Sequence, residues 1–205
     1  MATTLQPPSV KFPSLRGVRR TQEVEPEVPS TGIWVGLAAI TMTFAAFTSA
    51  MIVRHGSAPD WRHFSFPVIL YFNTIVLIAS SFTLQIARKR FAALSNGISD
   101  SGPALRALYG TLTLGCLFVC GQYAAWLQLR SEGIYLATNP SSSFFYLFTV
   151  LHALHVIGGL LGLIYVINKL HRNVLAKNTL GAASLYWHFM GVLWLYLLGL
   201  LWVRI

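Results

Sequence analysis

Three histidines are the side chains best able to do chemistry in this sequence. His152 and His155 lie in FFYLFTVLHALHVIGGLLGLIYVI, a run with no Asp, Glu, Lys or Arg, and His188 lies in YWHF near the C-terminus. An imidazole can ligate haem or a metal ion, carry a proton, or hydrogen-bond to a neighbouring helix. The rest of the sequence must decide between these roles.

The spacing of the histidines argues against a shared metal or haem site. His155 falls near the middle of its apolar run, but His188 lies only about five residues into the next, an offset of roughly 7–9 Å at 1.5 Å per helical residue. A zinc site needs another strong ligand and usually a carboxylate, and the runs lack Asp and Glu away from their ends. We therefore expect no metal ligand in this chain.

The favoured role of these side chains is packing inside the membrane. Neutral imidazoles can bond across helices to amides, hydroxyls or carbonyls, and small residues let backbones approach closely, as the Gly158 and Gly162 spacing suggests. The residues expected to pack in this way are Asn73, Gln122, His152, His155, Gly158, Gly159, Gly162 and His188.

The composition indicates a membrane protein. The chain has 205 residues, of which 55% are hydrophobic and 10% charged, whereas a soluble domain has about 25% charged residues. The net charge of +9 does not suggest a nucleic-acid partner, because the basic residues lie in short connectors between apolar runs.

Five apolar stretches approach the roughly 20 residues that span a bilayer, and backbone groups in lipid must bond within their own segment. The sequence therefore predicts an all-α membrane bundle over residues 32–205, after an irregular tail over residues 1–31. We expect Pro103 and Pro140 in connectors and Asn178–Gly181 in a turn. The predicted spans are 32–53, 66–87, 104–129, 144–168 and 183–203.

The distribution of basic residues predicts the orientation of the bundle. Eleven Lys and Arg residues lie on the side of the N-terminal tail, and four lie on the other side. Cytoplasmic connectors carry the excess of positive charge. We expect the N-terminus inside and the C-terminus outside.

Four segments resemble subunit III of the haem–copper oxidases, the cytochrome c and quinol oxidases of respiratory chains. They are FNTIVLIASSFT at 72–83, TLGCLFVCGQYAAW at 113–126, SSFFYLFTVLHALHVIGG at 142–159 and YWHFMGVLWLYLLG at 186–199. Family members usually have seven helices, and this chain resembles the shorter five-helix bacterial form.

The resemblance implies a role without catalysis in this chain. Subunit III carries no metal centre, because haem and copper belong to subunits I and II, and it packs on subunit I, binds phospholipid and supports oxygen reduction coupled to proton translocation. The implied location is the bacterial inner membrane, with a larger respiratory supercomplex as a further assembly. Candidate lipid contacts are Lys169, Arg172, His155 and Trp187.

The chain departs from the family pattern at three acidic positions. FPVILYFNT lacks the membrane glutamate common in the family, and Ala125 and Gly191 stand where acidic residues are usual. Proton-handling roles of those carboxylates are not carried over. The alternatives are an accessory subunit of a nitric oxide reductase, a haem-binding membrane cytochrome that uses the three histidines, and an independent transporter.

Overall fold

The computed structural model describes residues 30–57, 67–95, 101–136 and 138–204, and this part of the chain contains helices and no strand. The helices are α1 (Ser30–Ser57), α2 (Ile69–Ser95), α3 (Gly102–Ser131), α4 (Pro140–His171) and α5 (Lys177–Arg204). All five are long and apolar enough to cross a membrane, which confirms the predicted all-α, five-helix fold. The predicted tail lies outside the described residues, except that Ser30 and Thr31 begin α1.

The helices extend beyond the predicted spans at every end but one, because a helix continues through the interface after its apolar residues end. The exception is the start of α2, which was predicted at residue 66, whereas the helix begins at Ile69. The expectation that Pro103 and Pro140 lie in connectors was wrong, since Pro103 is the second residue of α3 and Pro140 is the first residue of α4. Proline suits the start of a helix because the first helical N–H groups have no intrahelical partner. Asn139 caps α4 by accepting a hydrogen bond from the Ser142 backbone N–H at 2.9 Å.

The turn expected at Asn178–Gly181 was also misplaced, because those residues lie in the first turns of α5. The chain reverses earlier, directly after α4, where Asn173 adopts a positive φ of 56°. Asparagine tolerates this left-handed conformation better than most residues. The N–H groups of Asn173 and Val174 donate to the carbonyls of Leu170 and Lys169, which closes the end of α4.

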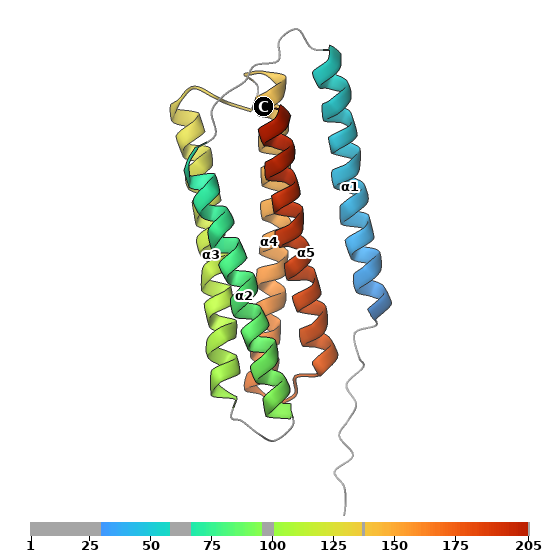
Figure 1. Cartoon of the computed structure of the whole chain (residues 1–205), viewed down its shortest axis with the longest axis vertical. Helices are drawn as coiled ribbons and strands as arrows, with labels where there is room; N and C mark the ends of the chain where they lie inside the picture. The colour runs from blue at the N-terminus through green and yellow to red at the C-terminus, as the bar shows by residue number, and fades with distance from the viewer. Residues whose placement is uncertain (1–29, 58–66, 96–100, 137, 205) are drawn as a thin grey trace, which may run out of the picture.

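The five helices run alternately up and down, so that the C-terminus lies at the same end of the bundle as the connector between α3 and α4 (Figure 1). The most extensive contact joins α2 to α3, and α4 and α5 complete the packed bundle. Within the described chain, α1 contacts only α4 and α5. Most of the α1 surface is therefore open to lipid or to another protein.

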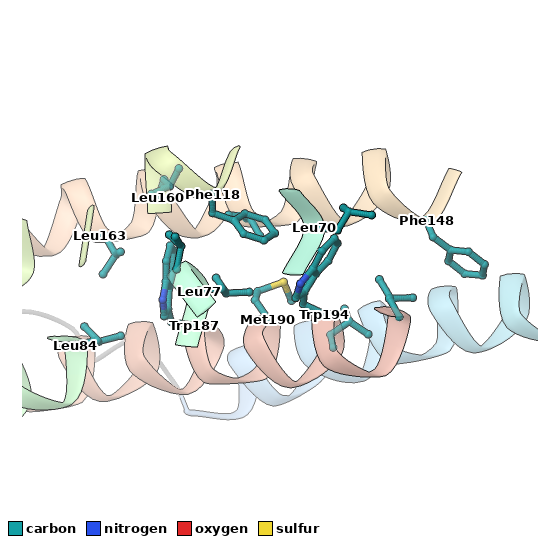
Figure 2. Close-up of a cluster of buried hydrophobic side chains, with 14 of the residues drawn as sticks. Leu70, Leu77, Leu84, Phe118, Phe148, Leu160, Leu163, Trp187, Met190 and Trp194 are labelled. Atoms are coloured by element: carbon teal, nitrogen blue, oxygen red, sulfur yellow. The ribbon is translucent and has the colours of Figure 1, made fainter. Parts of the chain in front are cut away.

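Buried residues recur at alternating intervals of three and four along the helices, the spacing of left-handed helix packing. Figure 2 shows the resulting core, in which Trp187, Met190 and Trp194 of α5 lie among leucines of α2 and Phe118 of α3. The buried series are 70, 73, 77, 80, 84, 87 and 91 in α2, where Val76 is buried in addition, and 104, 108, 111, 115, 118, 122, 125 and 129 in α3.

Candidate functional site

A row of polar groups runs along the helix interfaces of the bundle, and we call it the polar seam. Most of its members are fully or almost fully buried, with Thr74 only partly covered. Polar groups that cannot reach water are stabilised by partners within the protein. The polar seam consists of Asn73, Thr74 and Ser80 of α2, Gln122 of α3, His152 of α4, and Trp187 and Trp194 of α5.

Two tryptophans join α5 to α2 across the polar seam. The indole N–H of Trp187 donates to the Ser80 hydroxyl at 2.9 Å, and that of Trp194 donates to the Thr74 hydroxyl at 3.0 Å. Hydrogen bonds between membrane helices contribute about 0.6 kcal/mol on average and up to roughly 1.7 kcal/mol. Trp187 is only 2% exposed, so its ring packs against helices rather than lipid.

His152 occupies the centre of the bundle and has no exposed surface. Its ring lies 5.1 Å from the Trp194 ring and 5.9 Å from the Phe118 ring, measured between centroids. Neither imidazole nitrogen has a hydrogen-bond partner among the described residues. The surroundings of His152 are therefore aromatic, and the hydrogen bond expected across the helices is not formed there.

Gln122 lies at the same level of the bundle as His152. On the α3 face toward α4, Phe118 contacts His152 one turn before Gln122, and Trp126 one turn after it donates to Thr149 at 3.1 Å. The Gln122 amide, like the His152 ring, has no hydrogen-bond partner in the described chain. These two buried side chains form the least satisfied part of the polar seam.

The other two histidines contact different helices. Nδ1 of His155 lies 2.7 Å from the Leu151 carbonyl, and its ring lies 5.8 Å from Phe44 of α1. His188 is half-buried and lies one turn after Ser184 of α5, whose hydroxyl accepts a hydrogen bond from Arg88 of α2 at 3.4 Å. In the part of the chain that the structure describes, no three His, Cys, Asp or Glu side chains gather in a metal-binding arrangement.

The predicted packing glycines differ in their surroundings. A Cβ at Gly159 would lie 3.0 Å from Tyr186 and 3.2 Å from Trp187, so this glycine permits the contact between α4 and α5. Gly158 and Gly162 lie on the exposed face of α4, where a Cβ would meet at most the Tyr186 hydroxyl at 3.8 Å. Their spacing does not join helices within the described part of the chain.

Asn73 packs against a glycine that sequence reasoning did not select. The Asn73 Nδ2 lies 3.5 Å from the Phe118 carbonyl, and its Oδ1 occupies the space that a Cβ at Gly121 would fill. Gly121 thus allows α2 and α3 to approach closely enough for the amide of Asn73 to lie between them.

Replacement of Gly121 by alanine should lower the free energy of unfolding by about 1–3 kcal/mol, because the new methyl group must displace the Asn73 amide. The matched control is Gly110→Ala on the same helix, where nothing lies within 4 Å of the added Cβ. Unfolding in mixed detergent micelles, followed by far-ultraviolet circular dichroism, measures both variants. Equal stability of the two would contradict the close approach at Gly121.

Several further polar contacts between helices were missed from the sequence. The Thr83 and Thr111 hydroxyls lie 2.9 Å apart, and the Tyr196 hydroxyl donates to Thr48 at 3.1 Å. The Tyr186 hydroxyl donates to the His155 carbonyl at 2.8 Å. The sequence signal for such contacts was the spacing of polar and aromatic residues by three, four or seven positions, which places them on one face of a helix. Trp187 and Trp194 are an example, seven residues apart.

The basic lipid candidates lie at the end of α4. The Lys169 ammonium lies 5.1 Å from the centre of the Tyr165 ring, and Arg172 is exposed at the helix C-cap. The positions that are acidic in the family also have defined surroundings, because Ala125 is fully buried and a Cβ at Gly191 would lie 3.7 Å from the Ser81 hydroxyl.

Comparison with known proteins gives one consistent result. The model of the family described as cytochrome c oxidase subunit III matches residues 37–204. A probable cytochrome c oxidase subunit 3 from Mycobacterium tuberculosis is 35% identical over 83% of this chain and 85% of its own, and one from Nocardia farcinica is 32% identical with the same coverage. The cytochrome c oxidase subunit 3 of Thermostichus vulcanus is 30% identical, covering 87% of this chain and 88% of its own.

Proposed function

The chain belongs to the cytochrome c oxidase subunit III family, and we propose that it stabilises its complex by packing on subunit I and holding phospholipid beside it. It is an accessory, multi-pass membrane subunit of a haem–copper oxidase and associates with other oxidase subunits. Haem and copper lie in subunits I and II in this proposal. The complex reduces oxygen with electrons from cytochrome c or quinol, and the reaction is coupled to proton translocation.

The packing role is supported by the contacts that the four motif segments make with one another. The segment at 72–83 supplies hydroxyls that accept from tryptophans of the segment at 186–199. The segment at 113–126 supplies Phe118, whose ring contacts His152 of the segment at 142–159. Because the motif residues hold the helices of this chain to one another, they support a structural role for the subunit.

The proposed orientation places the N-terminus in the cytoplasm of a bacterial cell and the C-terminus on the outer side of the inner membrane. The excess of Lys and Arg on the N-terminal side supports this choice. Lys169 and Arg172 then lie at the cytoplasmic head-group level, where each basic residue attracts anionic lipid by about 1 kcal/mol. His155, half-buried beside α1, is a third proposed contact near lipid.

The alternatives find less support. The relatives are named as oxidase subunits, and none of those given above is named as a nitric oxide reductase subunit. A membrane cytochrome needs histidines that face a common haem, whereas His152 lies against Phe118 and Trp194 and His155 lies against Phe44.

Co-purification tests the proposed assembly, and two neighbouring glycines provide a matched pair of variants. Gly158→Leu places a bulky side chain on the exposed face of α4, so the chain should fold but be retained less by subunit I. Gly159→Leu should disrupt the bundle itself, because Tyr186 and Trp187 already fill that space. The measurement is the amount of subunit I recovered with an affinity-tagged chain from native membranes.

If a folded Gly158→Leu variant retained subunit I fully, the exposed face of α4 would not be part of the proposed contact with subunit I. Recovery of the unmodified chain without any oxidase subunit would contradict the proposed packing on subunit I.

A further inference from the structure

A pocket of about 510 Å³ opens between the ends of α3 and α4 that the connector between these helices joins. These helix ends lie at the end of the bundle that also holds the C-terminus (Figure 1). Tyr123, Trp126 and Arg130 of α3 form one wall, and Tyr146 and Val150 of α4 form the other. Tyr135 and Leu136 of the connector close the top. The pocket combines one cation with aromatic and aliphatic side chains.

The walls of this pocket are held in place by hydrogen bonds. The Tyr146 hydroxyl donates to the Ile134 carbonyl at 2.9 Å, which ties the connector to α4. The indole N–H of Trp126 donates to Thr149 at 3.1 Å, which ties α3 to α4. The Tyr135 backbone N–H donates to the Thr138 hydroxyl at 2.8 Å. The cavity is therefore formed before a ligand enters.

Arg130 supplies an unsatisfied cation to the pocket. Its side chain is exposed, and its guanidinium makes no hydrogen bond or ion pair with the described residues. Glu132 is the only acidic residue among the described positions, and its carboxylate accepts from the Gln128 amide at 3.2 Å. The hydroxyls of Tyr123 and Tyr135 also have no hydrogen-bond partner there. Three donors thus remain available for an anion.

The depth of the pocket matches an amphipathic ligand. Arg130 is the penultimate residue of α3, while Val150 lies ten residues into α4, or roughly 15 Å along the helix axis. Leu127 and Val150 are 47% and 39% exposed and line its apolar part. Tyrosine and tryptophan are favoured at the level where head groups meet hydrocarbon.

We propose that this pocket binds an anionic phospholipid of the leaflet on the C-terminal side. Arg130 pairs with the phosphate, the free tyrosine hydroxyls donate to its oxygens, and the first acyl carbons lie against Leu127 and Val150. This site is separate from Lys169 and Arg172, which lie at the opposite end of α4. It does not depend on which subunits the chain contacts.

Native mass spectrometry of the full chain with phosphatidylglycerol or phosphatidylcholine of matched acyl chains tests the site. Arg130→Gln should weaken phosphatidylglycerol binding about tenfold, because a charge-assisted hydrogen bond is lost. Arg130→Lys should retain most of the affinity, which separates loss of charge from misfolding. Arg106→Gln is the control, since Arg106 is also exposed but lies at the other end of α3.

Filling the pocket gives an independent test. Val150→Trp keeps Arg130 but occupies the apolar part, and it should also reduce phosphatidylglycerol binding. Millimolar inorganic phosphate should not displace the bound lipid, because it lacks the acyl chains. Equal binding by the unmodified chain and Arg130→Gln, or displacement by inorganic phosphate, would overturn the proposal.

Discussion

Replacement of Trp194 by alanine should lower the free energy of unfolding by about 3–5 kcal/mol, the range for deleting a fully buried large aromatic side chain. Trp194 is 1% exposed, packs edge-on against Phe118 with ring centroids 5.1 Å apart, and contacts His152 at the same separation. Its removal leaves a cavity where α2, α3, α4 and α5 meet. Unfolding in mixed detergent micelles measures the change.

Two further tryptophan variants separate the contributions to this loss. Trp194→Phe keeps most of the ring but removes the hydrogen bond to Thr74, so it should cost less than the alanine variant. Trp202→Ala removes a side chain that is 68% exposed and should change stability by less than about 0.5 kcal/mol. If Trp194→Ala and Trp202→Ala were equally stable, the proposed core would be wrong.

Introduction of lysine at His152 should destabilise the bundle by about 3 kcal/mol or more, because a charged group at the centre of a membrane helix is costly. His152 is completely buried, and its ring faces Phe118 and Trp194 rather than a carboxylate. His152→Leu has a similar volume and no charge, so it should cost less than about 1.5 kcal/mol. The same unfolding measurement compares the two.

The relative stability of His152→Lys and His152→Leu, together with the haem content of the complex, distinguishes a packing role of His152 from haem or metal ligation. A packing histidine tolerates leucine and rejects lysine, and the assembled oxidase should keep its haem absorbance with leucine at position 152. Loss of haem from a stable His152→Leu complex would identify His152 as part of a redox site.

The number and type of the helices followed from the sequence because hydrocarbon imposes a simple physical condition. A backbone in lipid must satisfy its own hydrogen bonds, so each long apolar run becomes a helix. The ends were less predictable, since α4 begins at Pro140 through the Asn139 cap and not where its apolar run begins. Local capping chemistry overrides hydropathy at these positions.

The inward faces of the helices were harder to predict, because residues facing lipid and residues facing the bundle are both apolar. Phe82 is 68% exposed and Phe118 is completely buried, yet their side chains are identical. The usable signal was the spacing of polar and small residues. Asn73 and Ser80 are seven apart, as are Gly115 and Gln122, and all four lie on the α2 and α3 faces that pack inward.

Two adjacent glycines also show that the inward face of a helix is hard to predict from the sequence. Gly158 and Gly159 were both expected to pack, but neighbouring residues point about 100° apart around a helix of 3.6 residues per turn. Gly159 faces the rings of Tyr186 and Trp187, while Gly158 is exposed and a Cβ there would meet only the Tyr186 hydroxyl, at 3.8 Å. A hydrogen bond was also expected at His152, and the nearby aromatic rings could not be identified without knowing which face of α5 turns inward.

We propose that His152 and His155 serve as contacts between helices while the redox centres lie in other subunits. The most direct test is the reduced-minus-oxidised haem absorbance of the oxidase purified with the double variant His152→Leu, His155→Leu. We expect the same absorbance per mole of subunit I as in the unmodified complex, with lower retention of this chain. A complex that retained the chain but lost haem absorbance would contradict this proposal.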